Sequence, residues 1–353
     1  MKRRDYRKKT KRKSGRRLAI KISLLITLSA FIVVVAYGVS LQRKAVDAAD
    51  RAYEAVDNRT ISDLRDEAVE PLRDNVSVLF MGVDVSEERD EGGNGRSDAL
   101  LVATLNNKEK TVKLVSIPRD SYVYIPDRGR KDKITHAHAF GGTRGAIETV
   151  EGMLDVPIDF YITMNFDAFI EVVDAFGGID IDVDLPEEIL ELDENNKRII
   201  ELKPGMQHLD GKNALALART RKIDNDVERG KRQQDILESI LTAITKEATS
   251  IKSITKYGDV IDAVGDNMKT NMTFNQMKSF LEYVKGGLPE VEMINLAGEN
   301  DMSTGIYYWK LDEDHLESVK VEMQTHLGTT PPSSALTDSG SSLTNAGEST
   351  SPN

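Results

Sequence analysis

The chain has 353 residues, a formal net charge of −11 and no cysteine. The absence of cysteine excludes a disulfide framework and a thiol nucleophile. The length fits one sizeable domain with appendages better than two domains. Residues 1–21 contain 12 Lys and Arg and one Asp, which leaves −22 for the rest of the chain, so the two ends are expected to face different surroundings.

A stretch of 20 residues without a charge, residues 22–41, follows this basic segment. It is long enough to cross a hydrocarbon core of about 30 Å as a helix. Because Lys and Arg precede it, we expect a single-pass cell-membrane protein with a cytoplasmic N-terminus and residues 42–353 outside. A cleaved signal peptide is the alternative, but its apolar core would be shorter and Ala36-Tyr37-Gly38 matches a cleavage site poorly. We interpret residues 1–21 as a topology and anionic-lipid signal, and we expect no nucleic-acid partner.

The segment after the apolar stretch, residues 42–75, is rich in Ala, Glu, Asp and Arg. Its apolar residues recur at helical spacing, which predicts a helical stalk. A globular domain is expected over residues 76–327. Continuous apolar runs predict its first strands, and residues 328–353, rich in Ser and Thr, are expected to be disordered. The predicted strands are 76–83, 99–105, 111–117, 160–164, 179–183, 291–296 and 305–311, and the predicted helices are 145–154, 168–176, 214–220, 226–245 and 273–283.

This mixture of strands and helices predicts an α/β or α+β layered domain, in which helices cover a central sheet. Polar side chains stand at the ends of its first three strands. Asp84 ends the first, Arg96 and Asp98 open the second, and Arg119 and Asp120 follow the third. A single Asp after a strand is most often a turn residue or a helix cap. Five such groups at three adjacent strands favour a functional site, because open sheets build sites at strand ends.

A second cluster lies in the stretch 219–234, RTRKIDNDVERGKRQQ. Its closely spaced guanidinium groups match phosphate, which Arg binds bidentately. On the helix predicted to start at Asp226, Arg229, Arg232 and Gln233 share one face near the N-terminus, where an anion is favoured. The alternative is a solvated charged helix in which Arg232 pairs with Glu228.

His136 and His138 form an H-x-H pair, which on a strand would place both imidazoles on one face. No third nitrogen or sulfur ligand stands nearby, so a structural role is favoured over a transition-metal site.

Seven ordered blocks of sequence carry a resemblance to a known family. From about residue 76 to residue 245 the chain resembles the LytR-CpsA-Psr family of membrane-anchored cell-wall enzymes. The family core usually ends soon after the last block, whereas this chain continues through residues 250–330, which we interpret as completing the same domain. The blocks are LFMGVD, GRSDALLV, VSIPRDSYV, DKITHAHAFGG, VDAFGGIDIDV, GMQHLDGKNALALARTR and DVERGKRQQ.

The resemblance implies an α/β/α sandwich with a mixed central sheet and an apolar groove for a prenyl chain. It implies transfer of a glycopolymer, such as teichoic acid or capsule, from a polyprenyl pyrophosphate carrier to a peptidoglycan acceptor, with Mg²⁺ or Mn²⁺ on the pyrophosphate. Asp84 and Asp98 match the metal-associated carboxylates. We expect Asp226, with Asp98 as the second candidate, to act as the catalytic base. The pyrophosphate-binding positions are Arg96, Arg119, Arg219, Arg221, Arg229 and Gln233, and Arg119 is also expected to be catalytic.

Two other functions stay open at this point. Water in place of the sugar hydroxyl would make the protein a polyprenyl pyrophosphate phosphohydrolase. A regulator of envelope synthesis that binds such lipids without turnover is the other alternative, which the complete set of Asp and Arg residues disfavours.

Overall fold

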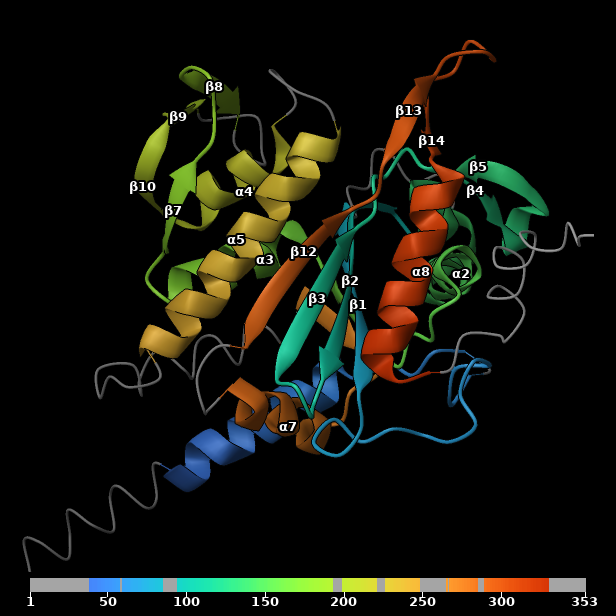
Figure 1. Cartoon of the computed structure of the whole chain (residues 1–353). Coiled ribbons are helices and arrows are strands. Elements are labelled where there is room, and N and C mark those ends of the chain that lie inside the picture. The colour runs from blue at the N-terminus through green and yellow to red at the C-terminus, as the bar shows by residue number, and fades with distance from the viewer. Residues whose placement is uncertain are drawn as a thin grey trace, which may run out of the picture. The chain divides into compact units, whose positions relative to one another are not determined.

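The computed structural model describes residues 38–57, 59–84, 94–192, 199–220, 226–247, 265, 267–284 and 289–329 (Figure 1). Of the expected membrane span, only residues 38–41 belong to these ranges, and almost all of the expected disordered tail lies outside them. No helix in these ranges combines the length and apolarity needed to cross a membrane. The chain divides into two compact units, one of residues 55–163, 220–235 and 279–353, the other of residues 1–54, 164–219 and 236–278. We call them the sheet unit and the second unit.

The sheet unit is built on β6 (Phe160–Met164), β1 (Val76–Asp84), β2 (Arg96–Asn106), β3 (Thr111–Ser116) and β12 (Glu290–Asn295), in that spatial order. β1 and β3 both pair with β2 antiparallel, whereas β12 pairs with β3 parallel. The sheet is therefore mixed, as expected. Its first strands form where the sequence has continuous apolar runs, because such runs are buried by layers on the sheet.

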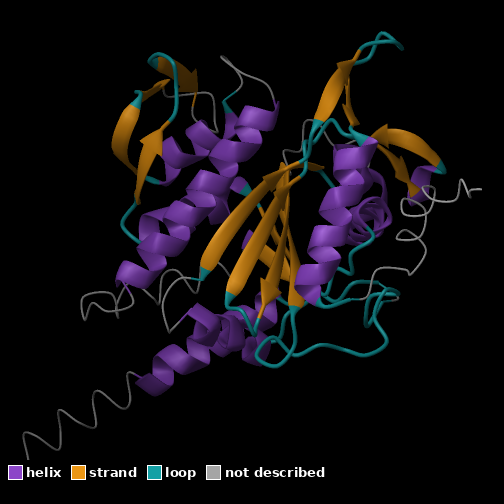
Figure 2. Ribbon diagram, in the orientation of Figure 1, coloured by secondary structure: helices purple, strands orange, loops and turns teal. Residues whose placement is uncertain are grey.

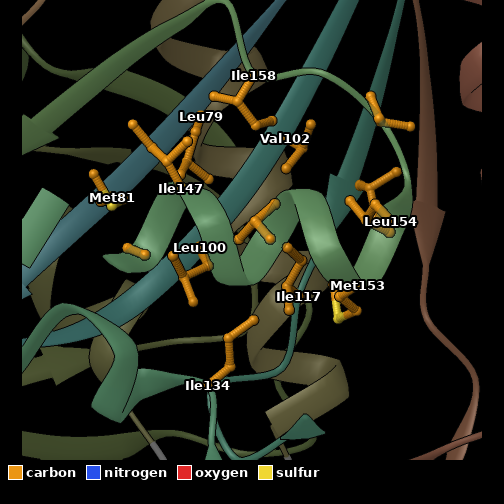
Figure 3. Close-up of a cluster of buried hydrophobic side chains, with 14 of the residues drawn as sticks. Leu79, Met81, Leu100, Val102, Ile117, Ile134, Ile147, Met153, Leu154 and Ile158 are labelled. Carbon is orange, nitrogen blue, oxygen red and sulfur yellow. The ribbon is translucent and has the colours of Figure 1, made fainter. Parts of the chain in front are cut away.

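Two helices, α2 (Thr135–Leu154) and α8 (Glu313–Leu327), pack together against β2 (Figures 1 and 2). Leu79 and Leu100 from the strands meet Ile147 and Leu154 from α2 in the core (Figure 3). Each of these side chains contributes about 1.5–3 kcal/mol by its burial. The sheet is thereby fixed under its helical layer, and its edge becomes a rigid place for a site.

Helix α8 is missing from the helices predicted by sequence, although its end signals are present. The side chain of Asp312 accepts a hydrogen bond from the backbone N–H of His315 at the N-terminus, and Gly328 adopts φ 72° at the C-terminus. An Asp cap and a left-handed glycine are the usual helix start and stop signals.

Two hairpins extend the sheet unit. The first pairs β4 (Tyr122–Ile125) with β5 (Arg130–Lys133) around a 3₁₀ turn, η2 (Pro126–Arg128). The second pairs β13 (Gly298–Asp301) with β14 (Tyr308–Leu311), so the strand predicted at 305–311 begins only at Tyr308.

The helix predicted for residues 42–75 ends at residue 52. Beyond it, residues 55–75 belong to the sheet unit and are fastened to it by arginines. Arg59 donates two 2.6 Å hydrogen bonds to Glu151, and Arg65 binds both oxygens of Asp159. These bidentate pairs, half-buried, fix the segment to the unit.

The second unit has its own elements. The strand β7 (Ile179–Val183) pairs with β10 (Gly205–Leu209), and β8 (Ile189–Leu192) pairs with β9 (Ile199–Leu202). The helix α3 (Phe166–Ala175) packs against α4 (Gly211–Arg219), and β11 (Met268–Thr270) follows later in the chain. The helices α5 (Asp226–Glu247) and α7 (Phe274–Val284) each contribute residues to both units.

The contact between α3 and α4 depends on a glycine. A Cβ at Gly211 would lie 2.3 Å from the carbonyl oxygen of Ile170, a backbone atom that cannot rotate away. We expect Gly211→Ala to lower the free energy of unfolding by about 1–3 kcal/mol, because the helices must separate. Thermal unfolding of the full chain measures this change.

The matched control is Gly152→Ala in α2, where a Cβ would meet no atom within 4 Å. This variant is expected to gain up to about 1 kcal/mol from helix propensity. Equal stability changes in the two variants would contradict the role of Gly211.

Candidate functional site

The predicted polar groups meet at one edge of the sheet. In the strand register Asp84 lies opposite Arg96, and Leu101 lies opposite Ser116. Because β1 and β3 run antiparallel to β2, the end of β1 lies at the start of β2, while β3 ends opposite Leu101 in the middle of β2. Arg119, just beyond β3, reaches Asp98 near the start of β2.

A β-bulge sets the position of Asp98. Gly82 pairs with Ala99 and Val83 with Ser97, so Asp98 is the extra residue between them. A bulge bends the strand locally and re-aims the side chain of the extra residue. The Asp98 carboxylate is therefore placed by the register between β1 and β2.

Arg119 is the principal partner of this carboxylate. Its Nη1 atom lies 2.7 Å from Oδ1 of Asp98, and the two side chains are 21% and 32% exposed. The carbonyl of Arg119 accepts a 3.1 Å hydrogen bond from the N–H of Thr135, which holds the loop to the start of α2. Oδ2 of Asp98 accepts no hydrogen bond from any residue that the structure describes. The pair is thus anchored through the backbone carbonyl of Arg119.

A second arginine reaches the same residue from α5. Nη2 of Arg229 lies 3.5 Å from the carbonyl oxygen of Asp98. Gly230 allows the helix to approach the sheet, because a Cβ there would lie 2.5 Å from Oγ of Ser116. Gln234 donates to the carbonyls of Leu114 and Ile294, which ties this turn of α5 to β3 and β12.

The two arginines of this helix are buried, so the alternative of a solvated charged face is wrong for them. Arg229 is 4% and Arg232 5% exposed. Arg232 donates a 2.9 Å hydrogen bond to the carbonyl of Thr220, which anchors the helix to the segment before it. A buried guanidinium is costly without polar partners. Arg119 thus contacts the carboxylate of Asp98, while the buried Arg229 contacts its backbone carbonyl.

The remaining predicted residues fall into two groups. Arg96 is exposed at the start of β2, Gln233 is half-buried on α5, and Arg219 ends α4 in the second unit. The guanidinium of Arg219 lies 4.4 Å from the centre of the Phe166 ring, a cation–π contact. Arg221 and the side chains of Asp84 and Asp226 lie outside the described part of the chain.

Two further residues lie near Arg119: Asp120, named among the strand-end groups but given no role, and Lys133, which was not predicted. Asp120 is buried, with Oδ2 3.5 Å from Nε of Arg119 and Oδ1 2.7 Å from Nζ of Lys133. Asp120 stands in the SIPRD block, but its link to Lys133 depends on pairing between β4 and β5. Asp120 therefore helps to position Arg119 through its Nε atom and connects it to Lys133 in the first hairpin.

The histidine pair lies on the helix α2 and not on a strand. Nδ1 of His138 lies 3.1 Å from the carbonyl of Gly95, and Nδ1 of His136 lies 3.2 Å from the Asp132 carboxylate. Burial alone would raise the pKa of Asp132, but hydrogen bonds from the Lys133 backbone and from His136 outweigh it, so this pKa lies below its ordinary value. Among the described residues, no group of three His, Asp or Glu side chains is placed to hold a metal ion.

Asp98, with Arg119 on its carboxylate and Arg229 on its backbone carbonyl, stands near strand ends of a mixed α/β sheet. Arginines near such strand ends are an arrangement suited to a phosphate group. The LytR_cpsA_psr family model matches residues 36–325. The chain belongs to this family. Because the match includes residues 250–325, the region expected to extend beyond the usual family core belongs to that core.

The proteins similar to this chain include a teichoic acid transferase, TagT, and its solved structures. Over 321 residues the chain is 38% identical to "Polyisoprenyl-teichoic acid--peptidoglycan teichoic acid transferase TagT" of Bacillus subtilis (strain 168), which covers 90% of this chain and 98% of that protein. A solved structure of TagT bound to LI-WTA is 35% identical, with a TM-score of 0.65, and covers 78% of this chain and 99% of that one. TagT with bound octaprenyl pyrophosphate lipid is 33% identical, with a TM-score of 0.61 and the same coverage.

Proposed function

We propose that this protein is a membrane-anchored phosphotransferase that joins a glycopolymer, of the teichoic acid or capsule type, from a polyprenyl pyrophosphate carrier to peptidoglycan. The observation that carries this proposal is the Asp98 residue between Arg119 and the buried Arg229. The names of the similar proteins support it, because they specify teichoic acid, a polyisoprenyl carrier and peptidoglycan. The single membrane span with a cytoplasmic N-terminus is part of the proposal and rests on the charge pattern of residues 1–41.

The chemistry needs an anionic centre to be neutralised. A hydroxyl oxygen of the acceptor attacks the phosphorus that carries the saccharide, the bond from this phosphorus to the bridging oxygen breaks, and polyprenyl monophosphate leaves. Charge builds on the phosphate oxygens, and positioned guanidiniums stabilise it. Arg119 and Arg229 are proposed to do this, with Arg96, Arg219, Arg221 and Gln233 as further contacts. Asp226 is proposed to accept the hydroxyl proton, with Asp98 as the second candidate.

A divalent ion fits the donor set at this edge. The Oδ2 atom of Asp98, which accepts no hydrogen bond from the described residues, is a hard oxygen ligand, and Asp84 ends the neighbouring strand. Mg²⁺ takes one or two carboxylates and completes its octahedron with phosphate and water, so three protein carboxylates are not required. We propose that Asp84 and Asp98 hold Mg²⁺ or Mn²⁺. When bound, the ion would supply further charge neutralisation on the pyrophosphate.

The test uses the full chain in detergent, because residues 55–75 are fastened to the sheet unit. The substrates are a polyprenyl pyrophosphate-linked saccharide and peptidoglycan, with Mg²⁺, and the label is followed in the saccharide and in the lipid. Release of polyprenyl monophosphate together with labelled peptidoglycan is expected. Release without transfer would instead identify a phosphohydrolase, and lipid binding with neither product would identify a non-catalytic binder.

A further inference from the structure

The first hairpin presents two tyrosines and two lysines on one face. Tyr122 lies opposite Lys133, and Tyr124 lies opposite Lys131 in the antiparallel register. Because side chains alternate along a strand, these four share one face, while Val123 turns to the core. Tyr122 and Tyr124 are 38% and 54% exposed. We use the name tyrosine–lysine face for Tyr122, Tyr124, Lys131, Lys133, Tyr307 and Tyr308.

The second hairpin enlarges this face. The ring of Tyr308 lies 4.6 Å from that of Tyr122, centre to centre, and tilts by 54°. Nζ of Lys133 lies 5.7 Å and 5.8 Å from the centres of the Tyr307 and Tyr308 rings. The backbone N–H of Trp309 on β14 donates to the carbonyl of Asp120, just before β4. This bond joins the two hairpins next to Arg119 (Figure 1). The rings are therefore held by backbone contacts.

The tyrosine–lysine face is continuous with the phosphate-binding edge. Lys133 forms a 2.7 Å ion pair with Asp120, and Asp120 faces Arg119. One chain of contacts thus leads from Asp98 through Arg119 and Asp120 to the lysine among the tyrosines. A molecule that lay on this face would have one end near the reacting phosphate.

The chemistry of the face matches a sugar chain. The electron-rich faces of aromatic rings attract the C–H faces of pyranose rings, and tyrosine hydroxyls remain available to sugar hydroxyls. Within the described ranges Lys131 forms no ion pair, so its charge is available to the carboxylates of peptides attached to a glycan. On β13, Glu299 lies opposite Lys310 and Asp301 opposite Tyr308, and their negative charges disfavour contact with a negatively charged lipid surface.

We propose that the tyrosine–lysine face docks the acceptor glycan strand of peptidoglycan, and that it orients a sugar hydroxyl toward the phosphate held at Asp98 and Arg119. The assignment of this glycan as the acceptor rests on the proposed function. Binding of the glycan to the face is a separate property, which can be measured without turnover.

The test compares the full chain with the double variant Tyr122→Ala/Tyr124→Ala and with Lys131→Ala. Each protein, in detergent, is sedimented with purified peptidoglycan sacculi from which teichoic acid has been removed. We expect the double variant to bind sacculi about 10-fold more weakly and Lys131→Ala to bind severalfold more weakly. In transfer assays the double variant is expected to raise KM for the acceptor about 10-fold, with the affinity for the polyprenyl pyrophosphate lipid unchanged.

The matched controls are Tyr53→Ala and Lys108→Ala, which remove an exposed tyrosine and an exposed lysine elsewhere. Both should bind sacculi like the parent chain, and thermal unfolding of every variant confirms that it is folded. Unchanged sacculus binding by a folded double variant would overturn the proposal. Loss of binding to phosphatidylglycerol vesicles, with sacculus binding retained, would overturn it in favour of a membrane contact. If the parent chain binds sacculi through Tyr122 and Tyr124 but transfers nothing, the proposed function fails while the docking face stands.

Discussion

Arg119→Ala is expected to lower the rate of glycopolymer transfer by at least about 100-fold. Arg119 lies 2.7 Å from Asp98, and the backbone of α2 and the carboxylate of Asp120 hold it in place, so its charge is positioned before the substrate arrives. Charge placed in advance stabilises the transition state without reorganisation. Initial rates of saccharide transfer to peptidoglycan measure the effect.

Two further variants separate the chemistry of Arg119 from its contribution to the fold. Arg119→Lys keeps the charge but loses the planar fork, so its rate should lie between those of the parent chain and the alanine variant. Arg73→Ala removes an exposed arginine elsewhere in the same unit and should transfer at the parent rate. If Arg119→Ala is folded and keeps more than about a tenth of the parent rate, Arg119 does not contribute to the transition state.

The sheet could be predicted because its strands are marked locally. The runs at β1, β2 and β3 are mostly apolar and end at turn residues or charges, so their polar ends could be assigned to one edge. The bulge at Asp98 could not be predicted, because it depends on how β1 and β2 pair and not on either strand alone. The candidate carboxylate was thus identified from sequence, but its orientation was not.

The burial of Arg229 and Arg232 could not be predicted from the local sequence. Their segment is so highly charged that the sequence pattern also fitted an exposed face. The structure buries them because this turn of α5 packs over β3 and β12, and Gln234 bonds to both strands. The strand β12 is about 60 residues farther along the chain, and its parallel pairing with β3 leaves no local signal. The pairing of β12 with β3, which is distant in sequence, therefore accounts for the burial of these arginines, which the local charge pattern did not predict.

The hairpin β4–β5 went unpredicted because its strands have four residues each, of which two are buried in β4 and one in β5. Short, half-polar strands are stabilised by their partners and not by their own composition. Tyr122 and Tyr124, and Lys133, which pairs with Asp120 next to Arg119, were consequently absent from the predicted site. Helix α8 differs, since Asp312 and Gly328 gave readable start and stop signals.

Asp98→Asn is expected to lower transfer at least about 100-fold at a Mg²⁺ concentration that saturates the parent chain. The substitution keeps the shape of the side chain but removes its charge. A lost metal contact of this kind removes several kcal/mol of charge stabilisation, and about 3 kcal/mol corresponds to roughly 100-fold in rate. Transfer rates over a Mg²⁺ titration measure both the maximum and the concentration for half activation.

The titration also separates the two partners of Asp98. If Asp98 only holds Arg119, the asparagine variant will be slower but will respond to Mg²⁺ at the parent concentration, and the metal assignment is then wrong. If Oδ2 binds the ion, half activation will shift to a higher Mg²⁺ concentration, and Asp98→Glu will restore part of it because a carboxylate returns. Asp155→Asn is the matched control: Asp155 ends α2 with φ 51°, a conformation that Asn tolerates, and bonds to Gln324. It should leave both the rate and the Mg²⁺ response unchanged.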